Sequence, residues 1–230
     1  MIKSAMILAA GFGKRIHPLT LKCPKPLLEI GNETLLSNTI KFLKEFGIKK
    51  VVVNTHYLAN QIADYIKNKK FNLTVNIIIE KDKILDTGGA VLNALQHFSN
   101  EPFLVINPDT IWNFNYLKEL KLMENLFVKN KKNKCSLLVV NKKKSFDKNF
   151  KGDFNLVNNK INRNSNNLDF IYTGLQIIKP ETFSNCKEKI FSMNKIWNEL
   201  IKNSELYGME SNIDFLHVST LDIYKELNIK

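Results

Sequence analysis

In the first half of the chain, short apolar runs alternate with segments whose apolar residues recur every three or four positions. The runs at residues 5–8, 51–53, 73–79 and 103–106 have the length and composition of buried strands. The periodic segments at residues 34–46, 57–66 and 89–98 have helical spacing, and Gly47 follows the first of them as a stop signal. Strands that alternate with helices in this way predict a parallel sheet covered by helices on both faces.

After about residue 135 the pattern changes to one that is richer in strands. Residues 136–140, 153–157 and 170–178 are predicted strands, residues 158–167 are a polar turn region, and residues 193–202 and 220–227 are predicted helices. Neither a repeat nor a linker interrupts the chain. The fold class predicted is therefore α/β, doubly wound and Rossmann-like, with a mostly parallel sheet and a strand-rich C-terminal half in a single domain.

Composition agrees with one domain inside a cell. The 230 residues are 44% hydrophobic, and no apolar run approaches the ~18–20 residues that a membrane-spanning helix needs. The apolar start leads into a glycine loop with a single lysine before it, unlike a secretory leader. Cys23, Cys135 and Cys186 have no paired spacing, which argues against a disulfide framework or a zinc site. We expect a cytoplasmic protein that does not bind membranes.

A net charge of +12 suits nucleic acid, anionic lipid or a polyphosphate substrate. Much of the excess lies between residues 129 and 151, where nine lysines accompany one acid, Asp147. No aromatic ladder or known nucleic-acid motif goes with these lysines. The simpler interpretation is a solvated basic face, and we expect no nucleic-acid partner.

Candidate chemistry begins directly after the first strand, in the segment Leu8-Ala-Ala-Gly-Phe-Gly-Lys-Arg15. Ligands of parallel α/β sheets bind at the carboxyl ends of strands, and glycines there let backbone N–H groups approach a phosphate or a base. Arg15 can grip anionic oxygens with two donors, whereas Lys14 or Lys25 acts as a point charge. The Walker loop is absent, and Ile16 stands where the dinucleotide fingerprint needs its third glycine.

A longer pattern is much more specific. The segment 8–15 is followed by Pro18-Leu19-Thr20, then by Pro24-Lys-Pro-Leu-Leu28, then by Gly31. Together these closely resemble the signature of the sugar-phosphate nucleotidyltransferase family. Each proline beside Lys25 fixes its own φ, so we expect the lysine to be held on a stiff, extended segment.

The resemblance extends over essentially the whole chain. Residues 85–90 look like the family's second loop, which faces the nucleobase and ribose, and residues 107–109 look like its metal-binding segment. Residues 152–154 and 172–174 look like the two pieces that line the sugar pocket, and residues 215–220 look like the segment that brings a second metal ligand. Among members, the likeness is greatest to N-acetylmuramic acid α-1-phosphate uridylyltransferases, with mannose-1-phosphate guanylyltransferase-like proteins close behind.

The resemblance implies a reaction in which a nucleoside triphosphate and a sugar 1-phosphate give an NDP-sugar and pyrophosphate. Residues 1–135 would form the nucleotide-binding half and residues 136–230 the sugar-binding half. The catalytic residues it implies are Arg15, on the leaving pyrophosphate, and Lys25, on the α-phosphate and the incoming phosphate. The implied nucleotide contacts are Leu8, Ala9, Ala10, Gly11, Gly13, Lys14, Thr87, Gly88 and Gly89. The implied sugar contacts are Asn107, Gly152, Asp153, Thr173 and Gly174. The implied metal ligands are Asp109 and His217, for Mg²⁺ with Mn²⁺ as the alternative.

Three positions depart from the family pattern. His217 stands where an aspartate is usual, Ser219 stands where a glycine is usual, and Arg163 alone remains of an acidic-basic pair that meets the sugar phosphate. His217 could ligate the metal or contact a phosphate. The departures at residues 217 and 219 also fit a catalytically inactive sugar-nucleotide sensor. The nucleobase, uracil or guanine, and the oligomeric state, monomer or homodimer, stay open.

Overall fold

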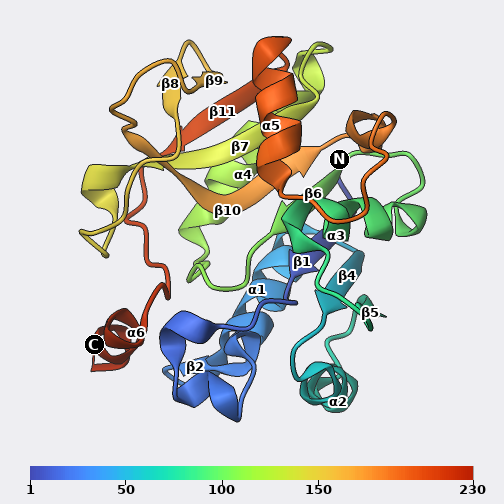
Figure 1. The fold of residues 1–230 in the computed structure, drawn as a ribbon, viewed down its shortest axis with the longest axis vertical. Coiled ribbons are helices and arrows are strands. Elements are labelled where there is room, and N and C mark those ends of the chain that lie inside the picture. Colours follow the sequence, from blue (N-terminus) through green and yellow to red (C-terminus); the bar gives the residue numbers. More distant parts are fainter. Residues whose placement is uncertain (230) are drawn as a thin grey trace.

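The computed structural model describes residues 1–229 and shows a twisted α/β fold around one large sheet (Figure 1). The strands of this sheet are β1 (Ser4–Leu8), β4 (Lys50–Thr55), β5 (Thr74–Ile79), β6 (Phe103–Ile106), β7 (Cys135–Asn141), β8 (Asn155–Val157), β9 (Lys160–Asn162), β10 (Phe170–Ile178) and β11 (Leu206–Ser211). A separate hairpin pairs β2 (Glu29–Ile30) with β3 (Glu33–Thr34). The helices are α1 (Leu35–Phe46), α2 (Ala59–Lys69), α3 (Asp86–Ala94), α4 (Asn115–Lys129), α5 (Met193–Lys202) and α6 (Leu221–Ile229).

The order of strands across the sheet is β5-β4-β1-β6-β10-β7-β11-β9-β8. The first four are parallel to one another, β10 runs antiparallel between β6 and β7, and β11 is again parallel to β7. β8 and β9 form an antiparallel hairpin at the far edge. The predicted α/β fold, with a parallel first half and a strand-rich second half, is confirmed.

Helices cover both faces of the sheet. On one face α1, α2 and α4 bury their apolar residues against β1, β4 and β6, with the Trp112 ring stacked on Phe42 in the same layer. On the other face α3 and α5 pack against the opposite side of the same strands and of β7. Because every one of these contacts removes apolar surface from water, the two layers supply the main stabilisation of the fold. None of the helices between residues 1 and 229 has the length and apolar composition to cross a bilayer.

The sequence patterns did not predict α4, β9 or β11. Along α4, Tyr116, Leu120, Met123 and Phe127 are buried at helical spacing. Leu122, Leu126 and Val128 are apolar but exposed, so the apolar residues of this segment do not follow a single helical period. β11 has the sequence Leu-Tyr-Gly-Met-Glu-Ser, which contains no β-branched residue. β9 lies within the region expected to be a polar turn, and Ile161 is its one buried apolar residue. Predicted strand 153–157 begins two residues later, at Asn155.

Candidate active site

A cavity of about 460 Å³ opens at the carboxyl ends of β1, β4, β5 and β6. It is lined by Leu8, Ala9, Ala10, Gly11, Phe12, Gly13, Lys14, Arg15, Ile16, Lys25, Pro26, Asn54, Glu80, Ile84, Asp86, Thr87, Ala90, Asn107, Pro108, Asp109 and Ser219. The signature loop, the second loop and the segment after β6 therefore meet at one place, as the resemblance implied. This is the end of a parallel sheet at which ligands bind.

The loop after β1 presents free donors and positive charge to this cavity. Gly13 has a φ of +64° and lies so close to Thr20 and Lys25 that a side chain would crowd both. The Thr20 hydroxyl donates to the Gly13 carbonyl at 2.9 Å, which fixes the turn. Arg15 follows on an exposed 3₁₀ turn, and its guanidinium makes no hydrogen bond or ion pair within residues 1–229. Its donors are therefore available to an anionic ligand.

Lys25 reaches the cavity from the segment between Pro24 and Pro26. The prediction that this segment is extended holds for Pro24, with φ −65° and ψ 141°, but Lys25 itself begins a 3₁₀ turn that ends at Leu27. Pro26 sits at a position near the start of that turn, where its missing N–H costs no hydrogen bond. The lysine is thus held on a tight turn rather than on an extended strand, and its side chain is only 14% exposed.

The segment after β6 is joined to the C-terminal segment by a short backbone ladder. Val218 N–H donates to the Asp109 carbonyl and Ile111 N–H donates to the Leu216 carbonyl, both at 2.8 Å. Thr110 pairs with His217 as an antiparallel bridge between these bonds. This pairing carries His217 across more than one hundred residues of sequence to the side of Asp109.

Asp109, Lys25 and His217 form a compact charged cluster. Lys25 Nζ lies 2.5 Å from Asp109 Oδ2, and His217 Nε2 lies 3.2 Å from the same oxygen. Burial alone would raise the pKa of the Asp109 carboxyl, but the Lys25 ammonium and His217 outweigh it and hold this pKa well below its usual range. Asp109 is therefore ionised at neutral pH.

The chemistry of this cluster fits a divalent cation in one respect. Asp109 Oδ1 is a buried carboxylate oxygen with no hydrogen-bond partner, and a hard cation prefers such a ligand. His217 does not line the cavity; its ring lies between Phe150 and Phe215, and its Nδ1 is buried without a partner. Within residues 1–229 no three His, Cys, Asp or Glu side chains gather into a ready metal site. Any metal here would take its remaining ligands from a substrate and from water.

In the second loop, Thr87 lines the cavity while the two glycines after it do not. The Thr87 hydroxyl accepts the Met193 N–H at 2.9 Å. Gly88 and Gly89 are buried, and both donate their N–H groups to the Phe191 carbonyl at 2.9 Å. A Cβ at either position would collide with Phe191 or with the Lys189 carbonyl. These glycines, expected to lie against a nucleotide, instead let α3 pack closely on the segment before α5.

The predicted sugar contacts continue from the cavity into β10. Asn107 lines the cavity, and its N–H donates to the Gly174 carbonyl at 2.8 Å. Gly174 lies in a β-bulge of β10. Thr173 is 1% exposed; its hydroxyl donates to the Leu138 carbonyl at 2.8 Å, and its carbonyl accepts the Thr110 hydroxyl at 2.7 Å. The Thr173 side chain is therefore committed to the sheet and not to a ligand.

Asp153 and Arg163 hold the outer wall of the same region. Asp153 Oδ2 accepts the Tyr172 N–H at 2.9 Å; burial raises the pKa of this carboxyl, and the Tyr172 N–H and the nearby Arg163 offset part of the rise. Arg163 donates to the Asp153 carbonyl and to two asparagine side chains on α5, and it lies over the Phe154 ring. The arginine expected to meet a sugar phosphate thus has all three guanidinium nitrogens engaged. Gly152 packs against the Leu168 carbonyl, where no side chain would fit.

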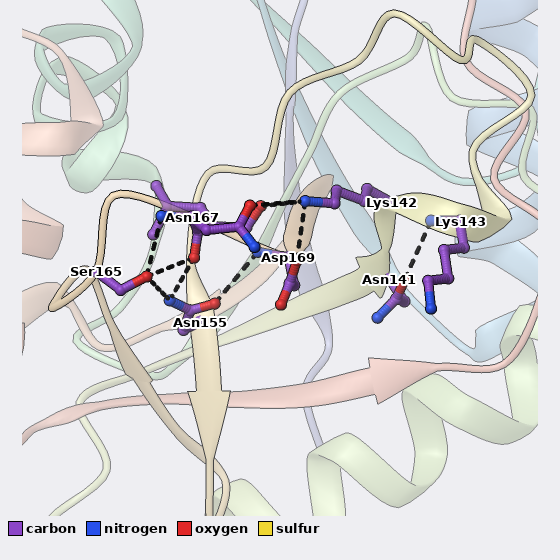
Figure 2. Close-up of polar contacts among 8 residues, drawn as sticks. Asn141, Lys142, Lys143, Asn155, Ser165, Asn167 and Asp169 are labelled. Atoms are coloured by element: carbon purple, nitrogen blue, oxygen red, sulfur yellow. Dashed lines mark hydrogen bonds and ion pairs between the residues drawn. The ribbon is translucent and has the colours of Figure 1, made fainter.

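Several lysines of the basic stretch hold loops rather than facing solvent alone. Figure 2 shows the Lys142 ammonium between the Asn167 side chain, at 3.0 Å, and the Asp169 carboxylate, at 2.9 Å. Asn155 closes the other side of this loop by bonding the Asn167 carbonyl and the Asp169 N–H. The same loop leads into β10 and its bulge, so Lys142 helps to fix the region expected to bind the sugar.

The sequence patterns missed several residues of the cavity wall. Phe12 is 37% exposed and packs against the rings of His56 and Tyr57. Asn54 lies one residue before the end of β4, and Glu80 directly follows β5. A polar residue at the carboxyl end of a parallel strand is the signal that could have identified them.

Ser219 is held by Asp147, the single acid of the basic stretch. Its hydroxyl donates to Asp147 Oδ2 at 2.6 Å, and the carboxylate is 8% exposed. A serine where the family usually has glycine thus has a defined partner, and Ser219 itself lines the cavity. No sequence spacing connects residues 147 and 219.

Comparison with known proteins gives consistent results. The chain is 27% identical over 222 residues to the N-acetylmuramate alpha-1-phosphate uridylyltransferase of Caulobacter vibrioides, covering 94% of this chain and 91% of that protein. It is 29% identical to the mannose-1-phosphate guanylyltransferase catalytic subunit beta of Drosophila melanogaster, covering 90% of this chain but only 56% of that longer protein.

Solved structures match over the full fold. The putative glucose-1-phosphate thymidylyltransferase of Bacillus anthracis superposes with a TM-score of 0.82 at 19% identity, covering 100% of this chain and 94% of that one. HddC of Yersinia pseudotuberculosis superposes with a TM-score of 0.76 at 20% identity, covering 99% of both chains. The family model described as nucleotidyl transferase matches residues 4–150, which include both loops and the Asp109 segment. The chain therefore belongs to the nucleotidyl transferase family.

Proposed function

We propose that this chain is a sugar-1-phosphate nucleotidyltransferase that joins a nucleoside triphosphate to a sugar 1-phosphate and releases pyrophosphate. The observation that carries the proposal is the convergence of Arg15, Lys25 and Asp109 on one cavity at the carboxyl ends of parallel strands. This convergence argues against an inactive sugar-nucleotide sensor, because a binding module has no need for a cation paired with a buried carboxylate at its phosphate site.

The sugar-phosphate oxygen would attack the α-phosphorus in line with the leaving pyrophosphate. Because this nucleophile is already an anion, the reaction needs no general base, and the protein contributes positioning and charge neutralisation. Arg15, whose donors are free, would hold the leaving pyrophosphate. Lys25 would stabilise the charge that develops on the α-phosphate, and its tight turn keeps the ammonium in place before the substrate arrives.

A divalent cation would supply further neutralisation of the phosphate oxygens when it is bound. Asp109 would hold it through the buried Oδ1, and His217 is the second candidate ligand. Mg²⁺ is the ion we propose, with Mn²⁺ as the alternative because imidazole is a softer ligand than carboxylate.

For the substrates we propose UTP and N-acetylmuramic acid 1-phosphate, which would make the product a cell-wall precursor. This choice rests on the similarity to the Caulobacter relative, which extends over nearly the full length of both chains. The guanylyltransferase relative supports GTP and mannose 1-phosphate as the alternative pair. Three free thiols are consistent with a reducing, cytoplasmic compartment.

Substrate choice is tested by pyrophosphate release from five nucleoside triphosphates, each with several sugar 1-phosphates. We expect the highest kcat/KM with UTP and N-acetylmuramic acid 1-phosphate. Turnover of GTP but not of UTP would make the guanylyltransferase assignment correct. Tight nucleotide binding without pyrophosphate release from any pair would instead support the inactive sensor.

His217 predicts an altered metal preference. If its imidazole takes the place of a carboxylate in the metal shell, activity with Mn²⁺ should equal or exceed activity with Mg²⁺. His217→Asp should then shift the preference toward Mg²⁺ without abolishing turnover, because it restores an oxygen ligand and a negative charge. The measurement is the ratio of kcat/KM in the two metals for each variant.

The matched control is His56→Asp. His56 lies near the loop after β1, where its ring contacts Phe12 and its Nδ1 contacts the Glu80 carbonyl, but it forms no ion pair with a carboxylate within residues 1–229. This variant should leave the metal ratio at the wild-type value. If His217→Ala also leaves that ratio unchanged, His217 orients Asp109 and does not ligate the metal.

A further inference from the structure

Glu80 is a buried carboxylate at the edge of the cavity that no step of the proposed reaction uses. It follows β5 directly and is 5% exposed. No Lys, Arg or His within residues 1–229 forms an ion pair with it. Its two oxygens each accept one hydrogen bond, Oε1 from Asn54 Nδ2 and Oε2 from the Leu85 N–H, both at 2.8 Å. A buried charge without a cation is costly unless such donors hold it in place.

These bonds belong to a longer chain across the end of the sheet. Asn54 Oδ1 accepts the Ala9 N–H at 3.1 Å, and the Asn54 backbone carbonyl accepts the same N–H at 3.2 Å, so the hydrogen-bonded chain runs from Ala9 through Asn54 and Glu80 to Leu85. Ala9 opens the signature loop after β1, and Leu85 begins the second loop and directly precedes α3. The chain therefore connects the two loops that flank the cavity, and Ala9, Asn54 and Glu80 all line it.

We infer that Glu80 and Asn54 are positioning residues that set the distance between the two nucleotide loops. The inference rests on the proposed function only in taking the ligand between these loops to be a nucleoside triphosphate. Neither residue needs to touch the reacting atoms. Their work is to hold the Ala9 and Leu85 backbones in place before the nucleotide binds, which lowers the ordering cost of binding.

The donor and the acceptor of every hydrogen bond from Ala9 through Asn54 and Glu80 to Leu85 are fixed. The Ala9 and Leu85 N–H groups can only donate, and an ionised Glu80 can only accept, so the Asn54 amide must present its oxygen to Ala9 and its nitrogen to Glu80. Glu80→Gln keeps the shape but adds a donor. In every orientation of the Asn54 and Gln amides, two N–H donors then face each other with no acceptor between them.

A second substitution restores the order of donors and acceptors. In Asn54→Asp combined with Glu80→Gln, the new carboxylate accepts from Ala9 and from the glutamine nitrogen, and the glutamine oxygen accepts from Leu85. The double variant also keeps one negative charge within this hydrogen-bonded chain, now at position 54. Asn54→Asp alone places two carboxylates against each other and should be the most disturbed of the three variants.

The test is equilibrium binding of UTP and GTP to the full chain, together with steady-state kinetics. Glu80→Gln should raise the Kd of the nucleotide by about 10-fold, the scale expected for one buried donor left without an acceptor. The KM of the nucleotide should rise with it, while the KM of the sugar 1-phosphate stays near the wild-type value. The double variant should return both nucleotide constants close to wild type.

Glu124→Gln is the matched control for loss of a buried carboxylate. Glu124 is 2% exposed and accepts bonds from the Ile2 N–H and the Lys121 ammonium, both at 2.5 Å, near the opposite end of β1. Its replacement should lower the thermal unfolding midpoint without changing nucleotide affinity. Glu80→Gln should change nucleotide affinity at temperatures where the variant is fully folded.

Two results would overturn the inference: a folded Glu80→Gln protein that binds nucleotide as wild type does, or a folded double variant that binds as weakly as Glu80→Gln. If Glu80→Gln does not fold, the double variant alone decides, because it should both fold and bind. Binding does not require turnover, so a wild-type protein that binds nucleotide but releases no pyrophosphate contradicts the proposed reaction and not the positioning role. A wild-type protein that binds neither nucleotide contradicts both.

Discussion

Lys25→Ala is expected to lower kcat/KM by about 10²–10³, the scale observed when one preorganised charge-stabilising group is removed from an active site. The ammonium lies in the cavity on a turn between two prolines, so it pays little ordering cost when the phosphates arrive. Its loss also leaves Asp109 without the cation 2.5 Å away. Arg15→Ala should have an effect of similar size. No group within residues 1–229 binds the Arg15 guanidinium, so its donors are free to bind the leaving pyrophosphate.

Lys22→Ala is the control for this prediction. Lys22 is exposed, lies three residues before Lys25 in the same loop and does not line the cavity. Its replacement should leave kcat/KM near the wild-type value, and both variants should unfold at similar temperatures. Near wild-type turnover by Lys25→Ala would remove Lys25 from the mechanism.

Asp109→Asn should reduce kcat by about 10²–10³ without raising the KM of the nucleotide. The amide keeps the size of the carboxylate but loses the charge that would hold a divalent cation. At the same time it releases Lys25 from its ion pair, so the triphosphate meets a freer cation and binds at least as well. This division between kcat and KM separates a role in charge neutralisation from a role in ground-state binding.

The same variant carries a prediction for stability. The pKa of Asp109 is depressed in the folded protein, so the ionised carboxylate stabilises the fold above the pKa of the unfolded chain, ~3.9. That contribution disappears as the pH falls through the folded-state pKa, and Asp109→Asn should remove it at pH 7. Glu188→Gln, which breaks the exposed pair with Lys195, should change neither kcat nor the unfolding midpoint appreciably. An Asp109→Asn enzyme with unchanged kcat would contradict the proposed role.

The parallel half of the fold could be predicted because its signals are local. Short apolar runs and helical periods mark β1, β4, β5 and β6 and the helices between them. The ends of these strands then place Arg15, Lys25 and Asp109 together, since the carboxyl ends of parallel strands share one edge of the sheet. The family signature added the role that we propose for each residue.

What escaped prediction depends on pairing between distant segments. The resemblance put His217 beside Asp109, but motif spacing alone does not reveal the ladder between residues 109–111 and 216–218 that brings it there. Ser219 is held by Asp147 from yet another segment. The packing role of Gly88 becomes visible only when Phe191 is in place. Neither hydrophobic periodicity nor motif spacing carries information about such contacts. The same is true of the hydrogen bonds that connect Ala9, Asn54 and Glu80.

The most direct measurement of the central claim is pyrophosphate release by the purified chain with a divalent cation, a nucleoside triphosphate and a sugar 1-phosphate, supplied together and separately. The account predicts pyrophosphate and an NDP-sugar in equal amounts only when both substrates are present, with the rate reduced by about 10²–10³ in Lys25→Ala. Absence of an NDP-sugar with every pair of substrates, or pyrophosphate release that needs no sugar 1-phosphate, would contradict it.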